Sequence, residues 1–345
     1  MVKKYLISLV LFCILYPVYN QIPAGYYDST GDLTGDQLKT ALYNIIKNHT
    51  EFPYSSSGTD VWDILKETDK DTSNSSNVIL LYSGWSVDAA QEFNNENGWN
   101  REHVWAKSRG DFGTSPGPGT DVHHLRPCDI TVNAERANRW FDNCNIPYYD
   151  GGVNTGSFTS NTSWVWQPRN EVKGDVARMI FYMAVRYEGE NGEPDLQLID
   201  YLPADDYTND PVHAKLSTLL DWHLEDQVDN FERNRNEVAF GYQKNRNPFI
   251  DHPEYAEMIW GTASNSKSPE FHASTISIYP NPAHNVIYFN NSGRFIFDLY
   301  SLTGIKLKSS SEDKMFLGEL EPGIYLLRVS DKKGKLIEVK KLIKK

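Results

Sequence analysis

The sequence has only three cysteines, no internal repeat of fixed period and no series of long apolar runs. The apolar run at its N-terminus, residues 5–18, contains Pro17 and is shorter than the ~20 apolar residues that span a bilayer. These absences exclude a collagen-like fibre and a multi-span membrane protein. Nine Trp, 20 Tyr and 15 Phe exclude a wholly disordered chain, because they bring large apolar area to bury.

Basic residues are also in the minority, 34 against 46 acidic ones, which gives a formal net charge of −12. This balance argues against a protein that binds nucleic acid through an overall positive charge. The charge is uneven along the chain. Residues 275–345 carry 12 Lys and Arg against seven Asp and Glu, whereas residues 21–274 carry a formal charge of −19. A chain of 345 residues allows two domains, and these two segments differ in electrostatic character.

The first 20 residues have the features of a cleaved secretory signal peptide. Lys3 and Lys4 precede the apolar run and polar Asn20 follows it. Cys13 lies within the run and is expected to leave with it. The mature chain then keeps Cys128 and Cys144. An exported protein with two cysteines most simply joins them in a disulfide, and two free thiols are the alternative.

Composition divides the mature chain into two modules and a linker. Residues 21–261 are rich in Trp, Tyr, Asn and Asp, whereas residues 262–274 are small and polar and predict a linker. Beyond it, short alternating runs separated by turn sequences predict a small antiparallel β-sandwich. The predicted strands are residues 275–279, 286–289, 295–300, 324–329 and 336–339.

The first module is predicted to be α+β. Apolar residues at helical spacing predict amphipathic helices over 35–49 and 171–187. Residues 78–82 read as a strand, and the glycine-rich residues 110–119 read as a long loop. A mixture of helices and short strands in this order favours the α+β class.

Polar residues whose side chains can act in catalysis or bind a metal are concentrated between residues 100 and 142. Glu102 and His103 are adjacent, and a pair of histidines follows in residues 121–127. Residues 129–142 are predicted to contain a helix, with Asp129 or Thr131 as its N-cap. One face of this helix consists of Asn133, Arg136, Ala137 and Trp140, at positions i, i+3, i+4 and i+7.

These residue types suit hydrolysis of a phosphodiester. The reaction needs a nucleophilic water, a base and a positive centre, which a neutral histidine and one hard cation held by carboxylate and amide oxygens supply. Glu102, His103 and Asn133 have these chemical types. Each alone also has an ordinary interpretation: a solvated glutamate, a buried hydrogen-bonded histidine and an asparagine that caps or bridges loops.

The ordered set of motifs resembles the bacterial endonuclease I family, which comprises secreted or periplasmic nucleases of the ββα-metal type. The resemblance covers most of residues 23–260. The motifs that carry it are PAGYY (23–27), REHVW (101–105), DVHHLRP (121–127), VNAERAN (132–138) and KGDVAR (173–178). It implies a strand, a loop and a helix around one divalent ion, usually Mg²⁺. Glu102 and Asn133 would be its protein ligands and His103 the general base, with waters and the substrate phosphate completing an octahedral shell.

Other residues of these motifs receive lesser roles. Arg136 is the arginine expected to contact phosphate, whereas Arg139 and Arg178 are expected in ion pairs. His123 and His124 are expected to be structural or to support the metal ligands, although an Asn occurs at the position of His124 in some family members. The tryptophans expected in the core, with base stacking as the alternative, are Trp105, Trp140, Trp164 and Trp166.

The C-terminal module resembles the sorting domain of the type IX secretion system. The motifs are YPNP (279–282), YSLTG (300–304), LEPGIY (320–325) and the basic end KKLIKK (340–345). The resemblance implies export across the outer membrane by the type IX machinery. Removal of the domain or attachment to the cell surface would follow.

The sequence therefore predicts a secreted, Mg²⁺-dependent, nonspecific endonuclease that acts on DNA, or RNA. A local basic cleft and the cation can outweigh the acidic net charge over about one Debye length, ~8 Å. We expect a monomer without a transmembrane segment in its mature form. One alternative is a zinc hydrolase that uses His103, His123 and His124 with Cys128, although no HExxH motif occurs. The other is a carbohydrate- or surface-binding module with exposed Trp and Tyr.

Overall fold

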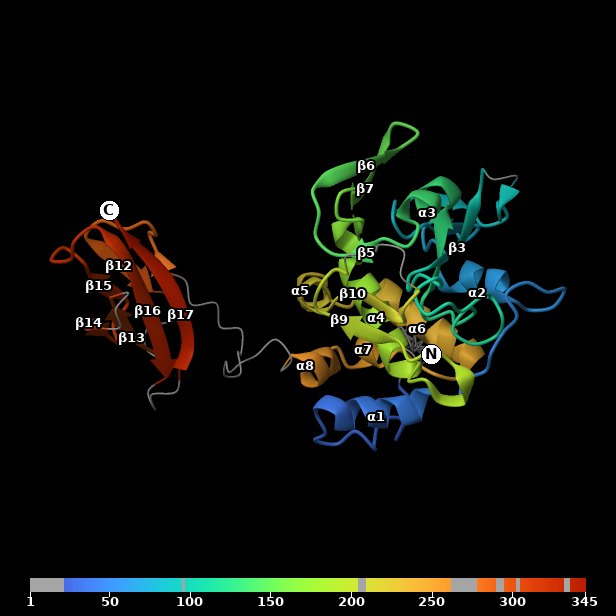
Figure 1. Cartoon of the computed structure of the whole chain (residues 1–345), viewed down its shortest axis with the longest axis horizontal. Coiled ribbons are helices and arrows are strands. Elements are labelled where there is room, and N and C mark those ends of the chain that lie inside the picture. Colours follow the sequence, from blue (N-terminus) through green and yellow to red (C-terminus); the bar gives the residue numbers. More distant parts are fainter. Residues whose placement is uncertain are drawn as a thin grey trace, which may run out of the picture. The chain divides into compact units, whose positions relative to one another are not determined.

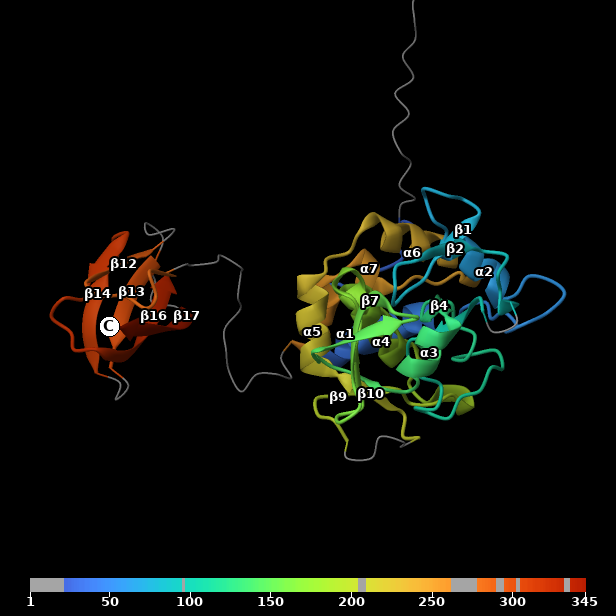
Figure 2. The ribbon, with the colours of Figure 1, turned by 90° about the horizontal axis from the view of Figure 1, so that it is seen from above.

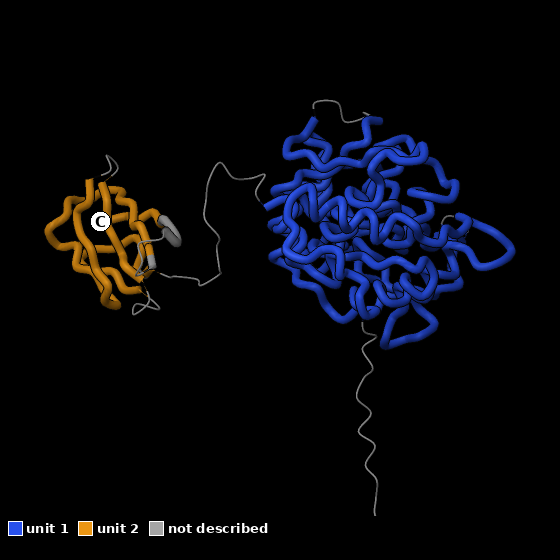
Figure 3. Tube along the Cα trace, turned by 90° about the horizontal axis from the view of Figure 1, so that it is seen from below, with its two compact units in different colours: residues 1–264 blue, residues 265–345 orange. Residues whose placement is uncertain are grey.

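The computed structural model describes most of the chain as two compact units, residues 1–264 and 265–345 (Figure 3). The described residues are 22–94, 97–203, 209–261, 278–289, 295–301, 305–331 and 336–345. The predicted signal peptide, residues 1–20, and the predicted linker, residues 262–274, lie outside them. The boundaries of these two segments therefore stay predictions.

The larger unit is α+β, as predicted from the sequence (Figure 1). Its helices are α1 (Gly35–Ile46), α2 (Val61–Thr68), α3 (Ile130–Arg136), α4 (Lys173–Arg186), α5 (Leu216–Glu225), α6 (Asn230–Gln243), α7 (Pro248–Asp251) and α8 (Glu254–Trp260). Short 3₁₀ turns lie at Asn170–Val172 and Glu190–Gly192. The two helices predicted over 35–49 and 171–187 are confirmed as α1 and α4.

In the described part of the larger unit, four small sheets accompany the helices. Two are antiparallel pairs, β1 (Asn77–Ile79) with β2 (Ser86–Asp88) and β3 (Trp99–His103) with β4 (Leu125–Asp129). A mixed sheet has the order β5 (Trp140–Phe141), β8 (Val165–Gln167), β7 (Val153–Ser160) and β6 (Ile146–Asp150). The fourth is a parallel pair, β9 (Gln197–Ile199) with β10 (Val212–Lys215).

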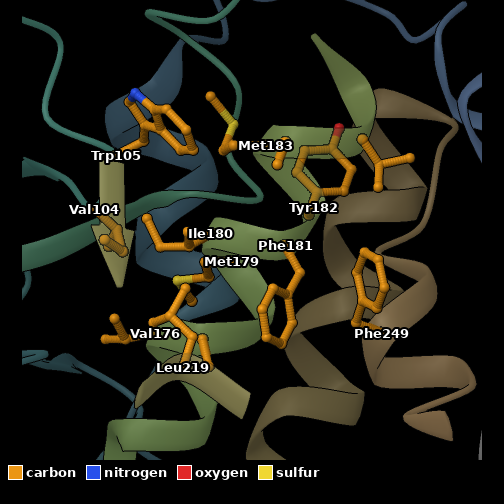
Figure 4. Close-up of a cluster of buried hydrophobic side chains, with 14 of the residues drawn as sticks. Val104, Trp105, Val176, Met179, Ile180, Phe181, Tyr182, Met183, Leu219 and Phe249 are labelled. Carbon is orange, nitrogen blue, oxygen red and sulfur yellow. The ribbon is translucent and has the colours of Figure 1, made fainter. Parts of the chain in front are cut away.

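Helix α4 lies at the centre of the larger unit, and all of its residues are buried. In the main core, Val176, Ile180 and Met183 of this helix belong to the same hydrophobic cluster as Val104 and Trp105, which directly follow β3 (Figure 4). Burying a large apolar side chain contributes about 1.5–3 kcal/mol. The core therefore anchors the chain immediately after His103.

Strands β3 and β4 and helix α3 form a ββα unit at one side of the domain (Figures 1 and 2). The strands are paired from Trp99 opposite Asp129 to His103 opposite Leu125. The side chain of Asp129 then accepts hydrogen bonds from the backbone N–H groups of Thr131 and Val132 and so caps α3. Of the two N-caps expected, Asp129 is the one observed.

Helix α3 is shorter than predicted. It ends at Arg136, because Ala137 has φ 49° and ψ −122° and turns the backbone out of the helix. Trp140 therefore begins strand β5, where it is buried, and does not share a helical face with Asn133. The predicted continuation of the helix through Trp140 is wrong.

The expected disulfide between Cys128 and Cys144 is not formed, and both residues are free thiols. Cys128 is buried in β4 and belongs to the hydrophobic core of the larger unit, where burial raises the pKa of its thiol well above the usual value. Cys144 lies in the connection after β5, where its backbone N–H donates to the side chain of Gln167. The alternative of two free thiols is the one observed.

The smaller unit is a β-sandwich, as predicted. One sheet has the order β11 (Ile278–Tyr279), β12 (Val286–Phe289) and β15 (Lys314–Phe316). The other has the order β14 (Lys306–Ser310), β13 (Phe295–Tyr300), β16 (Gly323–Asp331) and β17 (Leu336–Lys344). Both sheets contribute to one core, in which Phe289 and Phe297 stack with ring centres 3.8 Å apart. In neither unit do the described helices include one both long and apolar enough to cross a membrane.

Candidate functional site

A pocket of about 450 Å³ opens beside strand β3 and helix α3. Glu102, His103, Asn133 and Arg136 all line it, so the structure brings together the four residues that the sequence singles out. The antiparallel pairing of β3 with β4 and the direct start of α3 after β4 account for this convergence. Residues more than 30 positions apart are thereby placed around one space.

Glu102 lies at the end of β3 with only 2% of its surface exposed. The hydroxyl of Tyr82 donates a 2.7 Å hydrogen bond to its Oε1, and Nη1 of Arg136 lies 3.0 Å from the same oxygen. Neither contact uses Oε2. Burial raises the pKa of the Glu102 carboxyl, while Arg136 and Tyr82 oppose that rise. A tyrosine hydroxyl and a guanidinium therefore fix this carboxylate at Oε1.

His103 is oriented by the loop that precedes β4. Its Nε2 lies 3.0 Å from the carbonyl oxygen of Gly119, which can only accept a hydrogen bond. The ring proton is therefore on Nε2, and Nδ1 carries the free electron pair. Burial, followed by the nearby His124, lowers the pKa of His103 well below its ordinary value. At neutral pH the imidazole is uncharged and able to accept a proton at Nδ1.

The loop itself is held in place by close packing and by a second histidine. A side chain at Gly119 would lie 2.1 Å from the carbonyl oxygen of Gly113, so only glycine fits there. Nε2 of His124 donates a 2.7 Å hydrogen bond to the carbonyl oxygen of Pro118. His123 similarly donates to the carbonyl oxygen of Asn245, and both histidines are buried. Their rings thus have structural contacts, as expected.

An aromatic residue that the sequence did not single out also lines the pocket. The ring of Tyr54 is stacked on that of His103, with ring centres 5.8 Å apart. The guanidinium of Arg101 lies 3.3 Å from the centre of the Tyr54 ring and 4.0 Å from that of Trp62. Arg101 also donates hydrogen bonds to the backbone carbonyl of Tyr54 and to Ser55 Oγ. These contacts fix Tyr54 against the imidazole.

Asn133 comes from the middle of α3 and is half-buried at the pocket. Its Nδ2 donates a 2.6 Å hydrogen bond to Oδ1 of Asn100, which fixes the amide orientation and leaves Oδ1 of Asn133 as the acceptor atom of the side chain. Carboxylate and amide oxygens are the ligands that hard divalent cations prefer. The residues present therefore fit such an ion. Among the described residues there is no group of three or more His, Cys, Asp or Glu suited to a metal.

Arg136 is buried, with 1% of its surface exposed. Besides its contact with Glu102, it donates to the backbone carbonyls of His103, at 3.0 Å, and Val104, at 2.6 Å. It also donates to Nε2 of His213, at 3.1 Å. The guanidinium thus fixes the backbone at the end of β3.

The remaining predicted residues have structural surroundings. Arg139 pairs with Glu135 at 2.6 Å and Arg178 with Glu232 at 2.5 Å, which confirms the predicted ion pairs. Three of the four tryptophans assigned to the core are fully buried: Trp105, Trp140 and Trp166. Trp164 is half-buried, and its indole N–H donates to Oδ1 of Asn138.

The chain matches two family models and is similar to known extracellular proteins. Residues 34–254 match the family model described as endonuclease I, and residues 277–345 match that of the secretion system C-terminal sorting domain. The chain is 52% identical over 236 residues to an extracellular ribonuclease of Bacillus subtilis (strain 168) and 51% identical to an extracellular ribonuclease of Bacillus amyloliquefaciens. Each comparison covers 68% of this chain and 78% of the relative.

Proposed function

The chain belongs to the endonuclease I family, and from this premise we propose that its pocket hydrolyses phosphodiester bonds of DNA and RNA with Mg²⁺ as the cofactor. His103 is the general base, and Glu102 and Asn133 are the protein ligands of the cation. The observation that carries the proposal is the hydrogen bond from His103 Nε2 to Gly119, because it leaves a neutral Nδ1 at the pocket that holds both oxygen ligands.

Glu102 and Asn133 would hold a divalent cation, which would supply positive charge for the phosphate and the leaving oxygen. The protein's own part is to fix these two side chains. Tyr82 and Arg136 both bind Oε1 of Glu102 and so restrict rotation of its carboxylate. Asn100 performs the same task for Asn133 by accepting its amide N–H. Such supporting contacts orient ligands and raise their affinity for metal.

His103 removes the proton from the attacking water at Nδ1. The carbonyl of Gly119 accepts the Nε2–H bond throughout and stabilises the imidazolium that forms. Burial keeps the imidazole neutral before the reaction, which is the form that a base needs. The stack with Tyr54 restricts rotation of the ring, so Nδ1 stays aimed at the water.

Arg136 is better suited to a positioning role than to the direct contact with phosphate that the sequence predicts. All of its contacts given above are with the protein, and the side chain is almost fully buried. By binding Glu102 and the carbonyls of His103 and Val104, it fixes the metal ligand and the base relative to each other.

The substrate range follows from the chemistry. A water nucleophile does not require the ribose 2′-hydroxyl, so DNA and RNA are both accessible to this mechanism. The relatives are named extracellular ribonucleases, which supports RNA among the substrates. The C-terminal sorting domain indicates secretion by the type IX system, to the cell surface or the extracellular space.

Metal removal and substrate choice test the proposal. The purified protein should lose cleavage of plasmid DNA and of RNA in excess EDTA, and added Mg²⁺ should restore both. RNA with 2′-O-methyl groups should still be cut, because water is the nucleophile. Cleavage that survives EDTA, or that is lost with every 2′-O-methyl substrate and with DNA, would contradict the proposal.

A further inference from the structure

Three basic side chains line the pocket: Arg101, Lys107 and Arg136. Two of these side chains already form contacts with other groups of the protein. Arg136 is buried against Glu102 and backbone carbonyls. Arg101 is half-buried, stacks on Tyr54 and donates to the backbone of the same residue. Neither is placed to release its contacts for a substrate without disturbing the site.

Lys107 differs from both, because its side chain is exposed. Among the residues that the structure describes, its ammonium group has no ion pair. Its backbone is nevertheless fixed, since the carbonyl of Lys107 accepts a hydrogen bond from Phe112 and that of the preceding Ala106 accepts one from Arg109. Its side chain lines the same pocket as Glu102 and His103.

We propose that Lys107 is a substrate-binding residue whose ammonium group contacts a phosphate of the nucleic acid next to the scissile one. The inference rests on the proposed function. Residues 21–274 carry a formal charge of −19, so a polyanion is repelled by most of this unit. The exposed ammonium group of Lys107 at the pocket compensates for this repulsion locally. It does so for any base sequence, because phosphate carries no sequence information.

The alternative interpretation is a solvated surface lysine with no role. Salt dependence separates the two, because a lysine that neutralises a phosphate releases counterions when the substrate binds. Binding is best measured in a His103→Ala background with Mg²⁺ present, so that the substrate is not consumed. Fluorescence anisotropy of a labelled DNA duplex between about 50 and 200 mM salt gives the affinity and its salt slope.

In that background, Lys107→Gln should weaken binding at every sequence and reduce the slope of log affinity against log salt by about 0.9. Lys107→Arg should retain both the affinity and the slope. The matched control is Lys244→Gln, which removes an exposed lysine at the C-terminal end of α6. In the active enzyme, Lys107→Gln should raise KM by a larger factor than it lowers kcat.

If Lys107→Gln binds with the affinity and salt slope of Lys244→Gln, the proposal is overturned. It is also overturned if kcat falls while affinity and slope are unchanged, since Lys107 would then act on the chemical step alone. Failure of the proposed function looks different: the parent enzyme would not cleave nucleic acid with Mg²⁺, or His103→Ala would cleave at the parental rate.

Discussion

The ring of Tyr54 lies stacked on the imidazole of His103, with the ring centres 5.8 Å apart and the planes inclined by 22°. The two residues are 49 positions apart in the chain: Tyr54 lies in the connection between α1 and α2, and His103 lies in β3. A flat contact of this kind restricts how the imidazole can turn, and the hydrogen bond to Gly119 fixes it at the opposite nitrogen from Nδ1. Tyr54 therefore has a positioning role in the proposed mechanism.

Replacing Tyr54 tests this role. Tyr54→Leu should lower kcat about 10-fold or more while KM changes little, because a misaligned base affects the chemical step. Tyr54→Phe keeps the ring and should retain most of the activity. Steady-state kinetics on a defined duplex gives both constants. Equal losses in the Leu and Phe variants, or a loss confined to KM, would show that the stack does not position the base.

Local periodicity and turn chemistry predict many of the helices and strands correctly. The predicted helix over 35–49 appears as α1, and the strand over 295–300 is β13. Both rest on side-chain patterns that the local backbone must satisfy. The prediction extends helix α3 too far because helical spacing continues from Asn133 to Trp140, whereas the positive φ of Ala137 ends the helix and is not indicated by this spacing.

The candidate site, like the fold, is predictable from the sequence only in part. Glu102, His103 and Asn133 were found because their motifs lie in order along the chain, and the structure places them at one pocket. Tyr54 was missed because nothing around it in the sequence links it to His103. The buried state of Arg136 was missed as well, since a helical arginine in a polar segment is ordinarily exposed.

The contact between Tyr82 and Glu102 gives a prediction about the metal ligand. Tyr82→Phe removes the 2.7 Å hydrogen bond to Oε1 without changing the buried ring. Loss of such a supporting contact typically costs 10–100-fold in metal affinity or activity. We expect the Kd for Mg²⁺, measured by isothermal titration calorimetry, to rise about 10-fold. Tyr242→Phe, which alters a tyrosine in another pocket, is the control and should bind Mg²⁺ as the parent does.

Buried histidines should make the larger unit sensitive to acid. Burial lowers the pKa of His123 and of His124 to about 4, although Asp121 opposes the shift. In the unfolded chain a histidine has a pKa of about 6.5. Between these values the unfolded state binds protons that the folded state does not, so the free energy of unfolding falls as pH drops from 6.5 toward 4. The loss is of the order of 2–3 kcal/mol for each histidine.

Urea unfolding at several pH values, followed by tryptophan fluorescence, measures this loss. All nine tryptophans lie between residues 62 and 260, so the signal reports on the larger unit. His124→Asn should reduce the pH slope by about one proton, whatever its effect on stability at pH 7. His284→Asn, in the smaller unit, should leave the slope unchanged. An unfolding free energy independent of pH between 6.5 and 4 would contradict the neutral buried state of these histidines.

The two-unit organisation predicts that the larger unit works alone. Each unit has a hydrophobic core of its own. A chain that ends at Gly261 should therefore fold and cleave DNA with kcat/KM within about two-fold of the full chain, because a domain with its own core folds independently. Export from a host with type IX secretion should be lost. A truncated chain that is folded but inactive would show that the smaller unit belongs to the catalytic machinery.

The last prediction separates the base from the metal ligands. His103→Ala should leave the Kd for Mg²⁺ and for nucleic acid largely unchanged while lowering the rate by about 10²–10⁴, the usual contribution of a positioned acid–base group. Imidazole added to the solution should restore part of the rate in this variant. The same addition should have no effect on the ligand variants, because they keep the base.

Glu102→Gln and Asn133→Ala should instead weaken Mg²⁺ binding, and higher Mg²⁺ should recover part of their activity, since the lost group acts through occupancy and placement of the ion. Glu102→Gln is preferred to alanine because the amide oxygen can still accept the hydrogen bonds of Tyr82 and Arg136. Melting curves without metal check that each variant is folded. Near-parental turnover of His103→Ala at saturating Mg²⁺ would refute the assigned base, and unchanged Mg²⁺ affinity in Glu102→Gln would refute the assigned ligand.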